Sequence, residues 1–153
     1  MNTTTAINSP TVLPESVVEE FRPRPTAVLI KLLIEPELAA AATRIHGEHG
    51  AAFTAFLLGE VDLDELHPEK LEEAFLGAHM ASYASWEQAR SRLVEIAMEG
   101  VETRSNADAE FKAHFDRDSD GFFRHFFGHM RMVRIGDSIH VFVNRSNLHD
   151  PES

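Results

Sequence analysis

The sequence predicts a mainly α protein of the α+β class: a small helical bundle, further helices, and a C-terminal β-hairpin. Three observations support this. Short apolar-periodic segments separated by Gly and Pro fill residues 36–77, one long amphipathic segment spans residues 85–102, and two runs rich in β-branched residues close the chain. The 153 residues are 43% apolar, enough for one compact domain or two small packed units.

The first 25 residues are predicted to be a mobile arm and linker. Thr, Asn, Ser and Pro dominate residues 1–14, and Pro23 and Pro25 favour an extended passage. Residues 26–34 are apolar except for Lys31, so they could form a buried strand or a buried helix. We favour the helix.

Residues 26–103 are predicted to be an acidic helical bundle. Pro36 suits the first turn of a helix that runs until Gly47 and Gly50 interrupt it. Residues 51–58 give a second short helix, and an acidic connector follows. Pro68 then opens a helix that Gly77 closes. The strongest helix is 85–102, with Ser85 as its N-cap.

Residues 104–145 are predicted to form a helix-plus-hairpin subdomain. One helical stretch contains Phe111 and Phe115, and a second, about 119–128, contains four phenylalanines. MRMVRI and SIHVFV, joined by Gly136-Asp137, are typical of a β-hairpin. Residues 146–153 are predicted to be a disordered tail.

The charge distribution favours a protein partner. The net charge is −11, and residues 35–120 hold 19 acids against 7 bases. Such a field repels nucleic acid and membrane surfaces and attracts basic protein surfaces. The chain has no cysteine, no apolar run long enough to span a membrane and no export signal, so we expect a cytoplasmic protein.

No motif indicates an enzyme or a cofactor. There is no G-x-S-x-G, no P-loop and no G-x-G-x-x-G. Asp116, Asp118 and Asp120 copy the start of a calcium loop, but its twelfth position is Phe127 instead of Glu, so an acidic helix start is the better interpretation. His46 and His49 could share a helix face, yet no third metal ligand stands at a recognised spacing.

Clustered carboxylates are the candidate partner-binding residues. Glu95, Glu99 and Glu102 recur at four and three residues, which places about one carboxylate per 5 Å of helix. The full candidate set is Glu69, Glu72, Glu73, Glu95, Glu99 and Glu102, with Asp62, Asp64, Glu65, Asp108 and Glu110 as outer members. Ordinary solubility is the alternative explanation for these acids.

Several segments, taken in order, carry a family resemblance. HGEHGAAFTAFLL (46–58), LEEAFLG (71–77) and SWEQARSRLVE (85–95) are followed by FDRDSDGFFRHFF and a last strand ending in IHVFV. Over about residues 36–143 this pattern resembles the ArdA-type antirestriction proteins. Family members usually begin with an additional small α+β domain, whereas only about 35 residues precede the matching region here.

The resemblance implies an elongated, acidic homodimer that imitates bent B-form DNA and inhibits a type I restriction–modification enzyme or another DNA-binding protein. The candidate carboxylates would then act as phosphate surrogates. Two other hypotheses stay open. One is a non-enzymatic regulatory or structural dimer of a mobile element whose acids serve only solubility, and the other is a calcium- or zinc-binding module.

Overall fold

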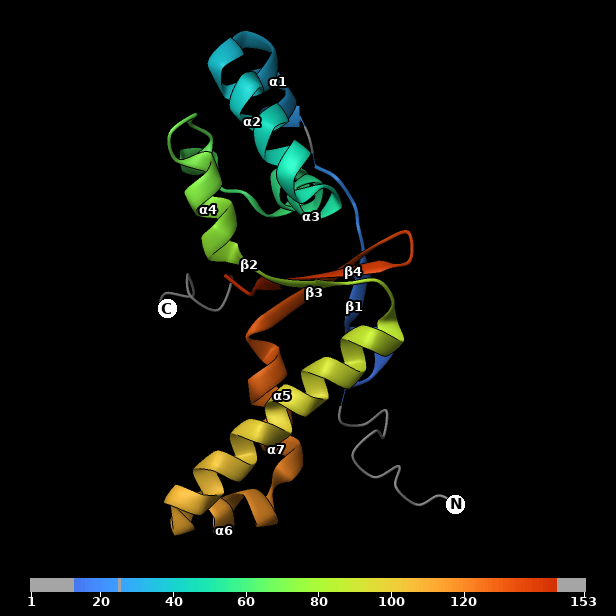
Figure 1. The fold of residues 1–153 in the computed structure, drawn as a ribbon, viewed down its shortest axis with the longest axis vertical. Coiled ribbons are helices and arrows are strands. Elements are labelled where there is room, and N and C mark those ends of the chain that lie inside the picture. The colour runs from blue at the N-terminus through green and yellow to red at the C-terminus, as the bar shows by residue number, and fades with distance from the viewer. Residues whose placement is uncertain (1–12, 25, 146–153) are drawn as a thin grey trace.

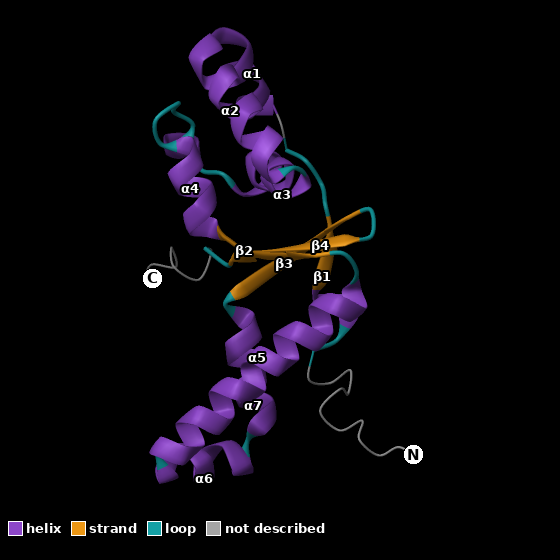
Figure 2. Cartoon of the chain, viewed as in Figure 1, coloured by secondary structure: helices purple, strands orange, loops and turns teal. Residues whose placement is uncertain are grey.

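The computed structural model describes residues 13–24 and 26–145, and its shape is elongated, with helices on both sides of a small sheet (Figure 1, Figure 2). The mainly α, α+β class is therefore confirmed. The predicted tail, and the predicted arm up to residue 12, lie outside the described residues. Within the described part of the chain, no helix is both long and apolar enough to cross a membrane.

The sheet has the strand order β1-β3-β4-β2. The predicted hairpin forms its centre: β3 (Met130–Ile135) pairs antiparallel with β4 (Ser138–Val143). Gly136 has a φ of 61°, a conformation that suits glycine in a hairpin turn. On the outer edges, β1 (Val18–Glu20) pairs parallel with β3, and β2 (His79–Tyr83) pairs antiparallel with β4.

The two edge strands differ from the sequence prediction. β1 lies inside the segment predicted to be a mobile arm, and β2 lies where only a Ser-containing turn was expected. Neither strand has a run of apolar residues that would indicate it locally. Both strands form because they pair with the open edges of the hairpin, whose unpaired N–H and C=O groups need partners.

On one side of the sheet lies the α1–α4 lobe: α1 (Thr26–Ile34), α2 (Pro36–His49), α3 (Ala51–Ala55) and α4 (Leu71–Ala78). α3 and α4 contact the strands, whereas α1 packs on α2 and projects away from the sheet (Figure 1). A π-helical turn, Phe56–Glu60, follows α3, and a 3-10 turn, Leu63–Glu65, precedes α4. Phe53, Phe56 and Phe75 are fully buried at the centre of this lobe, where Phe53 and Phe56 each make an edge-to-face ring contact with Phe75.

Helix boundaries in this lobe correct two predictions. The helical alternative for residues 26–34 is confirmed. Gly47, however, does not interrupt α2, which continues to His49; the chain turns only at Gly50, where φ is 63°. A helical glycine costs about 1 kcal/mol relative to alanine, and the burial of Ile45 against the core outweighs that cost. Likewise, Pro68 lies in a turn, and α4 starts at Leu71.

The opposite face is covered by the α5–α7 lobe: α5 (Trp86–Ala107), α6 (Ala109–Arg117) and α7 (Ser119–Gly128) (Figure 1). Ser85 caps α5 as predicted, its hydroxyl accepting the Gln88 N–H at 3.2 Å. The boundary placed between residues 103 and 104 falls inside α5, which ends only where Asp108 caps α6. The residues on either side of the predicted boundary belong to one continuous helix, although their composition had suggested two separate segments.

The sheet is a buried middle layer between two cores. On β3 and β4, Met132, Ile139 and Val141 pack into the core of the α5–α7 lobe. Val133 and Phe142 belong to the core of the α1–α4 lobe. Successive side chains of a strand point to opposite faces, so a strand buried on both sides is apolar at consecutive positions, as at Val141 and Phe142 of β4. The sheet thus separates the surfaces of the two lobes.

Candidate partner-binding surface

The three predicted glutamates of α5 border one shallow groove. Glu95, Glu99 and Glu102 are exposed along its rim, and Val94, Met98 and Val101 contribute apolar surface between them. Glu95 forms an ion pair with Arg92 at 3.0 Å. Within the described residues, Glu99 and Glu102 form no ion pair. The groove therefore combines apolar contact area with two carboxylates, those of Glu99 and Glu102, that can meet cationic groups of a partner.

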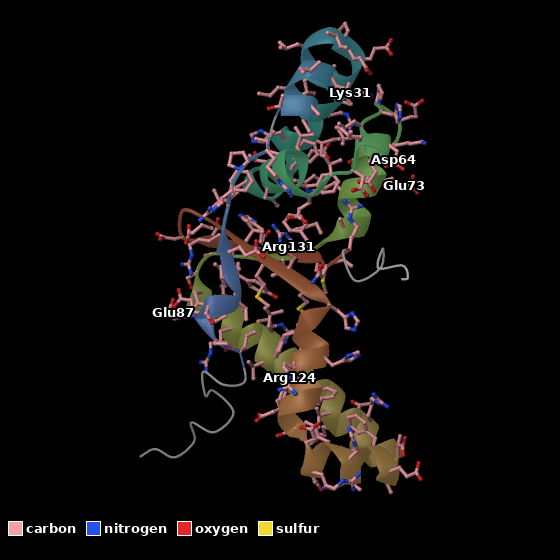
Figure 3. All side chains as sticks on the ribbon, turned by 180° about the vertical axis from the view of Figure 1, so that it is seen from behind. Lys31, Asp64, Glu73, Glu87, Arg124 and Arg131 are labelled. Atoms are coloured by element: carbon pink, nitrogen blue, oxygen red, sulfur yellow. The ribbon has the colours of Figure 1, made fainter. Side chains whose placement is uncertain are left out.

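The predicted cluster before and within α4 is only partly free. Glu69 lies in the turn before α4, and Glu73 is exposed on the helix. Glu72 instead pairs with Arg44 of α2 at 3.1 Å and helps hold the two helices together. Figure 3 shows Glu73 and the exposed Asp64 on the α1–α4 side of the molecule.

Two of the connector acids have a structural role. Asp62 and Glu65 form a capping box around the 3-10 turn. Arg145, beyond β4, then donates a hydrogen bond to Glu65 at 2.6 Å and lies 3.6 Å from Asp62. Burial alone would lower the pKa of Arg145, but the hydrogen bond and charge of Glu65 raise it, so the guanidinium stays charged. These acids tie the chain after β4 to the connector.

Of the two outer candidate acids at the α5–α6 junction, Asp108 has a structural role and Glu110 does not. The Asp108 side chain accepts the N–H groups of Glu110 at 3.0 Å and Phe111 at 3.2 Å, and so caps α6. The Glu110 side chain is exposed in the first turn of α6. Asp108 is therefore committed to the fold, whereas Glu110 can contact a partner.

The candidate carboxylates do not form one continuous surface. Those of the connector and α4 lie on the α1–α4 lobe, and those of α5 and α6 lie on the far side of the sheet (Figure 1). The α5 groove gathers three of the predicted carboxylates, Glu95, Glu99 and Glu102, along one helix face. It is the best-defined candidate site.

The calcium-like hexapeptide forms the helix junction that the sequence favoured. Asp116 closes α6 and pairs with Lys112 at 3.1 Å. The Asp118 side chain caps α7 by accepting the Gly121 N–H at 3.0 Å, and Asp120 lies in the first turn of that helix. Asp116 and Asp120 thus lie in helices, and the carboxylates of Asp116 and Asp118 are engaged by local partners.

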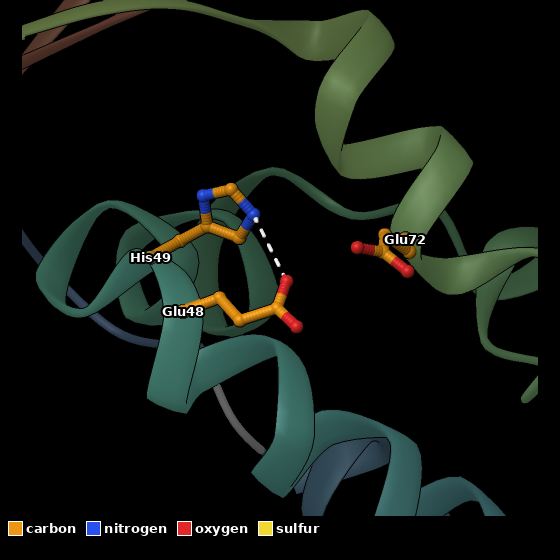
Figure 4. A group of neighbouring side chains, drawn as sticks. All are labelled: Glu48, His49 and Glu72. Carbon is orange, nitrogen blue, oxygen red and sulfur yellow. Dashed lines mark ion pairs between the residues drawn. The ribbon is translucent and has the colours of Figure 1, made fainter.

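A different group of metal-type ligands meets between α2 and α4 (Figure 4). The ligand atoms of Glu48, His49 and Glu72 lie within 4.8 Å of one another. Nη1 of Arg44, however, lies 3.1 Å from Glu72 and 3.8 Å from Glu48. The Arg44 guanidinium therefore already balances the negative charge that these two carboxylates would offer to a metal cation.

A histidine–serine array under α4 escaped sequence reasoning. His140, 4% exposed on β4, has Nδ1 2.8 Å from Ser82 Oγ and Nε2 3.0 Å from Ser138 Oγ. Ser138 donates to the Ile135 carbonyl, so its hydroxyl accepts from His140 Nε2, and His140 Nδ1 accepts the Ser82 hydroxyl. His79 Nε2 then donates to Ser82 at 2.8 Å.

Burial lowers the pKa of both imidazoles in this array, with the backbone at Ala81 opposing the shift at His79. A bulge between His79 and Ala81 brings His79 onto the same sheet face as Ser82. The array provides hydrogen-bond partners for both ring nitrogens of the buried His140. A bulge of this kind leaves no signal in the sequence, so the array could not be predicted from it.

Comparisons with protein-family models, with curated proteins and with solved structures give no match to this chain.

Proposed function

We propose that this protein is a non-enzymatic inhibitor that imitates DNA and binds the DNA-binding surface of a type I restriction–modification enzyme or a similar protein. The α5 groove carries the proposal, because three acids predicted as phosphate surrogates line one face of one helix. α5 has 22 residues, which gives a length of about 33 Å. A DNA channel lined with Lys and Arg would meet these carboxylates in sequence along the helix.

The charges around the groove favour recognition of a local row of carboxylates over attraction by a uniformly negative surface. Glu110 and Asp120 extend the anionic surface beyond α5 onto α6 and α7. Arg124 is exposed in the same lobe, opposite to the α4 side in Figure 3. Recognition by such a surface depends on the placement of individual carboxylates, and it weakens when salt screens them.

The proposal includes a homodimer, and α1 is its proposed interface. Leu29, Ile30, Leu33 and Ile34 are 45–83% exposed, and only Val28 of this helix is buried. An apolar groove shared with α2 and α3 adjoins them. The one charged residue of α1, Lys31, pairs with Glu35 at 3.4 Å, so the face is close to neutral.

A second copy suits this face better than other occupants. A basic protein would be drawn to the carboxylate surfaces, and a membrane-binding helix would need a cationic face that α1 lacks. Two copies with a net charge of −11 each repel one another least through a neutral patch. In a two-fold arrangement, Leu33 of one copy can enter the partner's groove beside Leu29.

The test is binding of the full chain to the methyltransferase core of a type I enzyme at 50–300 mM salt. We expect affinity to fall with salt, and the variant Glu95→Gln/Glu99→Gln/Glu102→Gln to bind at least roughly tenfold more weakly, since charge pairs at interfaces contribute more than about 1.4 kcal/mol together. The matched control changes three exposed acids outside the groove, Glu37→Gln/Glu87→Gln/Asp137→Asn.

Two results would count against the proposal. One is tight binding that ignores ionic strength, and the other is an equal loss of affinity in the control variant. If the triple Gln variant keeps full affinity for a partner, the acids serve solubility, and the regulatory or structural dimer of a mobile element becomes the better hypothesis.

A further inference from the structure

A pair of histidines lies at the C-terminal end of α7. His125 lies in the last turn of α7, and His129, four residues on, is the C-cap residue of that helix and keeps a right-handed helical conformation, so both side chains lie on one face. Their Nε2 atoms are 3.3 Å apart, their ring centroids are 4.6 Å apart, and both side chains are exposed. The two nitrogens therefore face each other at hydrogen-bond distance, and solvent can reach both side chains.

We propose that His125 and His129 bind a divalent transition metal ion, with Zn²⁺ as the best fit. Imidazole nitrogens bind zinc at about 2.0–2.1 Å, and two such bonds to atoms 3.3 Å apart enclose an angle near 107°, close to the tetrahedral value of about 109°. A square-planar ion would need the nitrogens about 2.9 Å apart. The observed separation favours tetrahedral coordination.

The backbone that carries the pair is held in place by the sheet. The Asn144 N–H donates to the His129 carbonyl at 2.8 Å, and the Asn144 side chain donates to the Gly128 carbonyl at 3.1 Å. Between the two histidines, Phe127 is buried in the core. Because this turn is already ordered, metal binding need order only the two imidazole rings, and water can fill the remaining coordination positions.

The charges around the other metal-type ligands favour the histidine pair. In the Glu48, His49 and Glu72 group, Arg44 already occupies the space between the carboxylates. No hydrogen bond joins His125 or His129 to a described cationic side chain. Without a metal ion, the two Nε2 atoms contact only each other, at 3.3 Å. This inference does not depend on the proposed partner.

The experiment is a Zn²⁺ titration of the untagged full chain at fixed neutral pH, by calorimetry and by competition with a chromogenic zinc indicator. We expect one site, and we expect His125→Ala and His129→Ala each to weaken it by about 100-fold or more, since loss of a second-shell partner alone costs about 10–100-fold. The control is His46→Ala/His49→Ala, which removes two imidazoles from α2 and should leave the site intact.

A second measurement does not depend on the variants. Co²⁺ bound between the histidines should give the intense visible absorption of a tetrahedral site, and Zn²⁺ should displace it. The proposal is overturned if the wild-type chain binds no zinc at 1 mM. It is also overturned if the α2 variant, and not the α7 variants, loses the site. Circular dichroism confirms that each variant is folded.

Discussion

Replacing Leu33 by Glu tests the proposed α1 interface, because the side chain is the most exposed large apolar group in the described residues, at 83%. In the isolated protomer it contacts little, so the substitution should change the free energy of unfolding by no more than about 0.5 kcal/mol. Glutamate is also a good helix former. Any large effect must therefore come from the dimer.

The expected effect on association follows from the exposed fraction. Burying a leucine completely contributes about 1.5–3 kcal/mol. With 83% of the Leu33 surface available and two copies in a two-fold interface, the loss is about 2.5–5 kcal/mol. The dimer dissociation constant should therefore rise by roughly two to three and a half orders of magnitude. Burying two carboxylates would increase it further.

Sedimentation equilibrium over a range of concentrations measures this directly. The matched control is Leu76→Glu, the same change at a 56% exposed leucine of α4, which should leave the dimer constant unchanged. A wild-type chain that stays monomeric at about 100 μM, or a control that dissociates as readily as Leu33→Glu, would refute the reasoning.

Two further predictions concern stability. The folded state keeps the pKa of His79 and His140 below that of the unfolded chain, so stability is full above about pH 6.5 and falls as the pH drops through that value, because the unfolded state binds more protons. Urea unfolding at pH 8, 7 and 6 checks this, and rising stability toward pH 6 would contradict it. Phe75→Ala should lower stability by about 3–5 kcal/mol, since the ring is fully buried. In a chain of this size the melting temperature then falls by about 6–20 °C, and a calorimetric loss under 3 °C would show that Phe75 is not central to the core.

The sequence by itself determined the elements with strong local signals. Gly136 can adopt the left-handed conformation that the hairpin turn needs, Ser85 caps a helix from within its own segment, and the acids around Asp118 mark a helix start. In each case the partner lies within a few residues, so the composition of a short window is sufficient. The same reasoning located the α5 glutamates on one helix face.

Only the tertiary structure decided which charges and edges remain free. Glu72 pairs with an arginine 28 residues away, and Glu65 pairs with Arg145 across 80 residues. The edge strands exist because a distant hairpin offers unpaired backbone groups, and the bulge at β2 turns His79 toward His140. These contacts join segments that share no local pattern. A carboxylate row can therefore be predicted from helical spacing, but its availability to a partner depends on long-range packing.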